Sequence, residues 1–270
     1  MLAFAANSLL NRLALQGETI DFASFTALRV VSGAAMLWLW LAMTGRLAAG
    51  TWRVSVWGPI SLVVYAAGFS WAYLQIEAGV GALILFGLVQ LTMTAVGYHR
   101  GKTLSLTGWA GVCLAVTGLI GLMLPGASTP PWQSAFVMAV AGMAWGVYSL
   151  LGQTAKQPLV ATTYNFVWSV PLVLIFLWWF RDDVFWQAKG VLLALASGMI
   201  ASAMGYALWY RVLPQLAPAT AASLQLSVPV IASFGGVVLL QELLTLRLIL
   251  ASLLILGGIA LVLRRPTPGT

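Results

Sequence analysis

The sequence predicts an all-α integral membrane protein with ten transmembrane helices, arranged as two inverted five-helix repeats around a central cavity. Of the 270 residues, 61% are hydrophobic and only 7% are charged, whereas about 25% of the residues of a soluble domain are charged. Apolar runs of about 20 residues, the length that crosses a bilayer, follow one another from end to end. The two halves of the chain also resemble each other. Together these features exclude a cytosolic enzyme, a disordered chain and a disulfide scaffold.

The charge-poor runs between charged or turn-forming residues define the predicted spans. They are too long for the strands of an outer-membrane barrel and lack the alternating pattern of such strands. The first is the shortest and contains Arg12. The ten spans cover residues 1–16, 22–44, 54–76, 79–98, 104–124, 132–153, 160–180, 190–211, 217–240 and 246–264.

The positions of the charged residues predict the orientation in the membrane. Ten spans place both termini on the same side, and the loops on that side carry eight of the 13 Lys and Arg residues. Because cytoplasmic loops are enriched in Lys and Arg, we expect both termini in the cytoplasm. The other side receives five basic residues, among them Arg29, and all six acidic residues. An interfacial belt of tryptophans is expected at the span ends, formed by Trp52, Trp57, Trp132, Trp178, Trp179 and Trp186.

An internal repeat appears when the sequence is shifted by about 135 residues. Gln90-Leu91 then falls on Gln225-Leu226. After a five-residue insertion, Gly118 falls on Gly258, within the similar segments 115–122 and 255–262. Five spans in each repeat make the second copy insert upside down, which is the plan of many secondary transporters, with the substrate site near mid-membrane. The predicted organisation is a first repeat at 1–125, a linker at 126–131, a second repeat at 132–265 and a tail at 266–270.

Several motifs resemble those of a known group of transporters. They are Leu-Asn-Arg at 10–12, Phe-Thr-Ala-Leu-Arg at 25–29 and Gln-Glu-Leu-Leu-Thr at 241–245. With ten spans in two halves, the chain resembles the EamA-type exporters of the drug/metabolite transporter superfamily over its whole length. The segments 7–12 and 20–25 are most similar to the YddG-type aromatic amino-acid exporters. The resemblance implies a basket of helices around a cavity and export from the cytoplasm.

Amide side chains form the first group of candidate site residues. Asn7 and Asn11 lie four residues apart on one face of the first span, and Gln90 and Gln225 occupy equivalent positions in the two repeats. Polar groups inside a membrane are costly unless they face a cavity or one another. All four are therefore predicted to bind substrate. The alternative is that they join neighbouring helices by hydrogen bonds.

Aromatic side chains within the spans form the second group. Tyr and Trp carry a polar group that needs a partner, which suits a cavity better than lipid. Rings lining a cavity would stack on a planar substrate or attract an ammonium group. The alternative is that individual rings pack in the helix bundle or belong to the interfacial belt. The predicted aromatic binding residues are Tyr65, Tyr73, Trp145, Tyr148, Trp168 and Tyr206.

Prolines and glycines within the spans are predicted to shape the helices. A proline inside a helix removes a backbone hydrogen bond, so Pro229, one turn after Gln225, and Pro171 are predicted hinges. Glycines allow helices to approach closely. We expect them to be packing positions, at 79, 81, 108, 111, 118, 121, 235, 236, 257 and 258.

These patterns, together with the resemblance to EamA-type exporters, predict a monomeric inner-membrane exporter that works by alternating access. Its most expected substrates are small metabolites, foremost aromatic and other neutral amino acids. Exporters of nucleosides or cationic drugs and a non-transporting scaffold are the alternatives. The only histidine, His99, lies at a span end and no catalytic group can be assembled, so the chain is not expected to be an enzyme. No metal, cofactor or nucleic acid is expected; the partners are the substrate and the bilayer.

Overall fold

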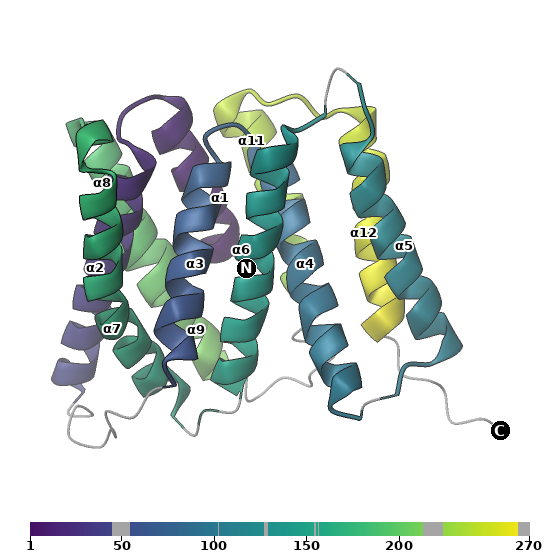
Figure 1. Cartoon of the computed structure of the whole chain (residues 1–270), viewed down its shortest axis with the longest axis horizontal. Coiled ribbons are helices and arrows are strands. Elements are labelled where there is room, and N and C mark those ends of the chain that lie inside the picture. The colour runs from purple at the N-terminus through teal and green to yellow at the C-terminus, as the bar shows by residue number, and fades with distance from the viewer. Residues whose placement is uncertain are drawn as a thin grey trace.

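The computed structural model describes residues 1–44, 55–101, 103–126, 129–153, 155, 157–212 and 224–263. The regular elements in this part of the chain are helices, which stand side by side in Figure 1. They are α1 (Leu2–Gln16), α2 (Phe22–Met43), α3 (Trp57–Ala72), α4 (Ala78–His99), α5 (Leu106–Met123), α6 (Trp132–Gln153), α7 (Pro158–Trp179), η2 (Arg181–Asp183), α8 (Ala188–Ala196), η3 (Ser197–Met204), α9 (Gly205–Val212), α11 (Ser227–Leu240) and α12 (Leu246–Leu263).

Seven of the described helices are long and apolar enough to cross a membrane. They are α2, α4, α5, α6, α7, α12 and the continuous helix Ala188–Trp209 that contains α8 and η3. The shorter helices α1, α3 and α11 fall within the other three predicted spans. The prediction of an all-helical membrane protein is therefore confirmed, while the count of ten spans stays a prediction.

Several helix starts follow from local chemistry. The first backbone N–H groups of a helix lack partners within it, so a side-chain oxygen at the preceding residue stabilises the start. Asp21 does this for α2 by accepting from the backbone N–H of Ser24 at 2.8 Å. Ser105 does the same for α5 through Gly108 at 3.1 Å. Both residues precede long apolar runs, which explains why the predicted and observed starts agree closely.

Helix contacts pair elements that are far apart in the sequence. The helix α2 packs on α7, α4 on α11, and α5 on α12. Two further pairs of contacts match between the two predicted repeats. The contact between α3 and α6 corresponds to the contact between α1 and α8, and the contact between α4 and α6 corresponds to the contact between α1 and α11. Each of these contacts joins the first half of the chain to the second, so the packed interior is shared between the two halves.

The loops that carry the acidic residues meet at one end of the molecule, at the top in Figure 1. The Asp21 carboxylate and backbone N–H bond to Phe185, which joins the α1–α2 and α7–α8 loops. Glu242, between α11 and α12, bonds to the backbone N–H of Ala78 at the start of α4. We call this end the acidic end. The predicted grouping of the acids agrees with this arrangement.

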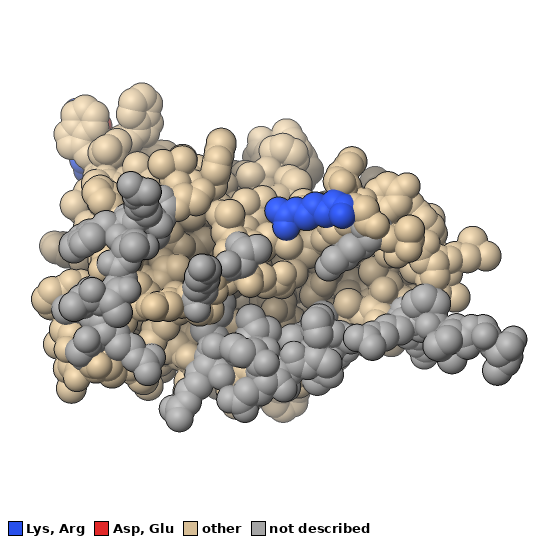
Figure 2. All heavy atoms as spheres, turned by 90° about the horizontal axis from the view of Figure 1, so that it is seen from below, with Lys and Arg blue, Asp and Glu red and all other residues tan. Residues whose placement is uncertain are grey.

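The opposite end carries the C-terminal ends of α2 and α4 and is seen from below in Figure 2. Arg100, which follows α4, is exposed there. Other basic residues predicted for this side lie outside the residues whose side chains are described: Arg46, Arg53, Lys102, Lys156, Arg211, Arg264 and Arg265.

Glycines let α5 and α12 approach until their backbones touch. A Cβ atom on Gly258 would lie 2.5 Å from the carbonyl oxygen of Gly111 and 2.6 Å from the backbone nitrogen of Ala115. A Cβ atom on Gly257, one residue earlier, meets nothing within 4 Å. The predicted packing role therefore fits Gly111 and Gly258 and does not fit Gly257.

We expect Gly258→Ala to destabilise the protein and Gly257→Ala to leave it nearly unchanged. The Gly258 methyl group meets backbone atoms that cannot move aside, and such overpacking costs about 1–3 kcal/mol. Thermal unfolding of the two purified variants in detergent checks this. Equal melting temperatures for the two variants would contradict the close backbone contact.

Candidate functional site

A buried polar network joins four helical elements in the interior of the bundle. Arg29 of α2 donates from Nη2 to the hydroxyl of Tyr65 in α3 at 2.9 Å, and from Nε to Oγ of Ser202 in η3 at 3.3 Å. Asn7 of α1 donates to the same Tyr65 hydroxyl at 3.1 Å and accepts from Ser197 of η3 at 2.5 Å. These bonds connect α1, α2 and α3 of the first half to η3 of the second.

Arg29 was expected among the loop charges at the end of a span, and the structure places it elsewhere. It is the eighth residue of α2, and only 2% of its surface is exposed. Its guanidinium carbon lies 5.1 Å from the ring centre of Tyr65 and 5.2 Å from that of Phe69, close enough for cation–π attraction. The expectation was wrong because it assigned Arg29 to a loop only from its sequence position near the start of a predicted span. In the structure, α2 points this side chain toward α3 and η3.

Aromatic rings pack directly beside this network. The Trp145 ring of α6 lies 4.7 Å from Tyr65 and 5.1 Å from Tyr206 between ring centres, and it stacks on Tyr148 at 5.3 Å. We call the connected rings the aromatic cluster. They come from α1, α3, α6, α7 and α9 and from Tyr73, which directly follows α3. They are Phe4, Tyr65, Phe69, Tyr73, Trp145, Tyr148, Phe166, Tyr206 and Trp209.

The π-helical segment η3 supplies two members of the network. π-helical turns are rare and frequently lie at functional sites. Here Ser197 and Ser202 of η3 reach Asn7 and Arg29, respectively. Gly198 packs so closely on α2 that an added Cβ atom would collide with the carbonyl oxygen of Arg29. The sequence carried no signal for this segment beyond its small residues.

The predicted amides have different surroundings. Asn7 is in the network, and Asn11 is fully buried with neither amide atom hydrogen-bonded among the described residues. Gln90 is buried in α4. Gln225 lies two residues before α11 begins, beside residues 213–223, which are not described. The predicted pair of glutamines at equal depth therefore stays a prediction.

Five of the six predicted aromatic residues lie in the aromatic cluster, and Trp168 does not. Trp168 is 48% exposed on α7, so it points out of the bundle. Trp57, Trp132, Trp178, Trp179 and Trp186 are also exposed, as an interfacial belt requires, and Trp52 lies outside the described residues.

The two predicted hinge prolines occupy unlike places. Pro171 lies inside α7, where it interrupts the backbone hydrogen bonds. Pro229 is the third residue of α11, which begins directly after the turn residue Leu226. A proline in the first helical turn removes no bond of its own helix, so Pro229 marks where α11 begins. The hinge role of both prolines stays a prediction.

An ion pair joins the two halves at the acidic end. Nε of Arg12 in α1 lies 3.4 Å from Glu242, and Nη1 of Arg12 bonds to the carbonyl oxygens of Tyr73 and Leu74. Both Glu242 oxygens lie 2.9 Å from the backbone nitrogen of Ala78. Burial raises the pKa of nearby Glu77, the Glu242 carboxylate raises it further, and Arg12 opposes the shift. We call the Arg12–Glu242 pair the latch.

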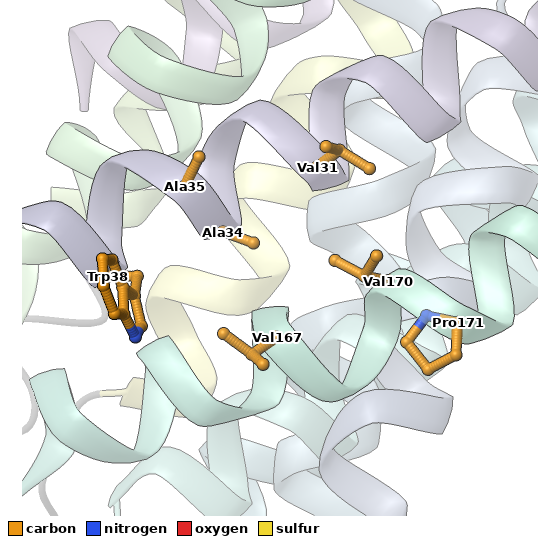
Figure 3. A pocket seen from close by; sticks show the side chains of 7 residues that line it. All are labelled: Val31, Ala34, Ala35, Trp38, Val167, Val170 and Pro171. Atoms are coloured by element: carbon orange, nitrogen blue, oxygen red, sulfur yellow. The ribbon is translucent and has the colours of Figure 1, made fainter.

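A separate groove of about 380 Å³ lies between α2 and α7 (Figure 3). Its lining contains no ionisable side chain. Four of the lining residues, Val31, Ala35, Trp38 and Pro171, are exposed at more than a third of their surface. The groove therefore suits lipid chains better than a polar solute. It is lined by Val31, Ala34, Ala35, Trp38, Val167, Val170 and Pro171.

Comparison with known proteins identifies the group to which the chain belongs. The EamA-like transporter family matches residues 132–264. The chain is 47% identical over 266 residues to an uncharacterized protein of Pseudomonas aeruginosa, PA1977, covering 97% of this chain and 91% of that protein. It is 27% identical over 224 residues to an uncharacterized transporter of Archaeoglobus fulgidus. This match covers 79% of this chain and 78% of that transporter. The chain belongs to the EamA-like transporter family.

A solved structure shows the fold of this EamA-like transporter over almost its whole length. A crystal structure with 20% sequence identity superposes with a TM-score of 0.66 and covers 96% of this chain and 95% of its own. The family match at residues 132–264 and the transporter relative confirm the resemblance to the drug/metabolite transporter superfamily. The narrower resemblance to aromatic amino-acid exporters stays a prediction. No group of three or more His, Cys, Asp or Glu side chains that could hold a metal occurs in the described ranges.

Proposed function

We propose that this EamA-like transporter exports small metabolites from the cytoplasm through the inner membrane. The leading candidate substrates are aromatic and other neutral amino acids. The observation that carries the proposal is the aromatic cluster around a buried polar network. Trp145 at its centre is 9% exposed and contacts rings from α1, α3 and α9. Rings of this kind stack on planar groups, while the network supplies hydrogen bonds for a polar end.

The proposed mechanism is alternating access by two inverted repeats, working as a uniporter. The paired helix contacts support it, because α1, α2 and α3 meet the second half along the same surface that contains the network. The family match at 132–264 also coincides with the second proposed repeat. The latch holds the halves together at the acidic end, so the proposed cycle opens one end while the latch keeps the other shut. The proposed orientation places both termini in the cytoplasm, with the chain acting as a monomer.

Transport in proteoliposomes tests the proposal. Vesicles loaded with labelled phenylalanine or tryptophan are expected to release the label faster than vesicles without protein. Panels of nucleosides and cationic drugs tell substrate classes apart. Release that requires an imposed pH gradient would exclude the uniport mechanism, and no release of any solute would favour a non-transporting scaffold.

Two tryptophan variants give the assay a matched comparison. We expect Trp145→Ala to slow phenylalanine release at least about tenfold. Stacking of the substrate ring on an aromatic side chain contributes on the order of 1 kcal/mol, and cation–π attraction to the substrate ammonium adds to it. Trp168→Ala is expected to transport normally, because that ring faces outward. Equal rates for the two variants would place the substrate away from the aromatic cluster.

A further inference from the structure

Arg29 is a buried cation that no Asp or Glu side chain neutralises. All six Asp and Glu side chains are described, and the two ion pairs they form involve Arg12 and Arg181. Asp21, the acid nearest to Arg29 in sequence, is bonded instead to the backbone N–H groups of Ser24 and Phe185. An arginine stays charged at any physiological pH, so its positive charge remains in the interior of the bundle.

The guanidinium group also keeps a free donor. Nε and Nη2 are hydrogen-bonded to Ser202 and Tyr65, whereas Nη1 is buried and has no hydrogen-bond partner among the described residues. A buried charge with an unused donor is costly, particularly inside a membrane. Tyr65 and Ser202 are neutral acceptors, so they orient the guanidinium without cancelling its charge. An anionic oxygen supplied by a ligand would do both.

A second unpartnered polar group lies close by. Asn11 is one helical turn from Asn7, which is bonded to the same Tyr65 hydroxyl as Arg29. Both amide atoms of Asn11 are buried without a hydrogen-bond partner among the described residues. Its oxygen can accept from an ammonium group, as its nitrogen can donate to a carboxylate. The described interior thus holds two unpartnered polar groups, one on α2 and one on α1.

We infer that Arg29 binds the carboxylate of the transported solute, with Nη1 as the donor, so that the substrates are small amphipathic carboxylates. The inference rests on the proposed transport function and narrows it. Charge-assisted bonds from arginine to carboxylates are among the strongest in proteins. The aromatic cluster takes the apolar part of the same molecule, because Tyr65 contacts both Arg29 and Trp145. A cationic drug would meet the positive charge of Arg29 and is disfavoured.

Binding by the purified full-length transporter in detergent tests the assignment with three probes. They are L-phenylalanine, its amide, which lacks the carboxylate, and 3-phenylpropionate, which lacks the ammonium group. The wild-type protein is expected to bind both carboxylates at least about tenfold more tightly than the amide, as about 1.4 kcal/mol from one charge-assisted bond implies. Binding of the amide as tightly as phenylalanine would overturn the inference.

Variants separate a binding role from a structural one. Arg29→Gln is expected to lose the preference for carboxylates, and Arg29→Lys to keep part of it. Trp168→Ala, which changes an exposed ring outside the network, is expected to keep the preference. A folded Arg29→Gln protein that binds phenylalanine as the wild type does would overturn the inference. If that variant does not fold, as judged by gel filtration and melting temperature, the wild-type comparison of acid and amide decides.

The same experiment distinguishes this inference from the proposed function. If no aromatic amino acid is bound or released, the proposed substrate class fails. Acid and amide pairs of whichever solutes are released, such as leucine and leucinamide, then test Arg29 by themselves. A preference for the acid in those pairs supports the carboxylate site, and equal transport of acid and amide contradicts it.

Discussion

Glu242→Gln is expected to destabilise the closed acidic end and to expose the interior beneath it. The variant keeps an acceptor for the Ala78 N–H group but leaves Arg12 without a negative partner. The side chains of Arg12 and Glu242 are only 11% and 7% exposed. Breaking a buried ion pair by removing one charge costs about 3–5 kcal/mol, and the remaining exposure reduces this to on the order of 2 kcal/mol.

Two measurements check the latch prediction. Thermal unfolding in detergent reports the stability. Opening is followed by labelling a cysteine at position 8 with a bulky maleimide, after Cys113 is replaced by serine. Ser8 lies one turn before Arg12 and is 1% exposed, so Ser8→Cys should react slowly unless the latch opens. We expect labelling to be several-fold faster when Glu242→Gln is added.

A second ion pair at the acidic end provides the control. Arg181 and Asp182 are 57% and 89% exposed, and exposed pairs contribute little. Asp182→Asn should therefore change neither the melting temperature nor the labelling rate. Unchanged stability and labelling in Glu242→Gln would show that the latch does not hold the halves together.

Gly198→Ala is expected to separate η3 from α2 and to weaken substrate binding. The added methyl group would collide with the carbonyl oxygen of Arg29 and with Oγ of Ser32. The carbonyl belongs to a helix backbone and cannot rotate away, so a cost of about 1–3 kcal/mol is expected. Any shift of η3 also disturbs the bond from Arg29 to Ser202, which orients the guanidinium.

Gly121→Ala is the matched control, because a Cβ atom at that position meets nothing within 4 Å. Melting temperature and phenylalanine binding are measured for both variants. The Gly198 variant should lose stability and affinity together, whereas the Gly121 variant should retain both. Full affinity in a destabilised Gly198→Ala protein would mean that η3 supports the fold without shaping the site.

Much of the fold was predictable because apolar length and charge act locally. A run such as 132–153 can only cross the bilayer as a helix, since backbone groups in lipid must bond within their own segment. The observed α6 has the same bounds. Asp21 and Ser105 mark helix starts by hydrogen bonds to residues three positions away, so these positions could also be found in the sequence.

The candidate site was only partly predictable. Asn7, Tyr65 and Trp145 were found because polar and aromatic side chains within a span suggest a cavity. Trp168 followed the same rule and is exposed, because the rule does not tell which face of a helix meets its neighbours. Arg29 carried a usable signal, a charge inside a predicted span, but was counted with the loop charges.

The sequence by itself determined that this is a helical membrane protein whose acidic residues lie at one end. Those properties depend on the length of each apolar segment and on the free-energy cost of placing charged residues in lipid. Both can be judged from one segment of the sequence at a time. Only the tertiary structure decided that Arg29 faces inward, that η3 brings Ser202 to Arg29 and Ser197 to Asn7, and that no Asp or Glu side chain pairs with Arg29. These features depend on how helices from both halves rotate and pack against one another, so no single segment contains them.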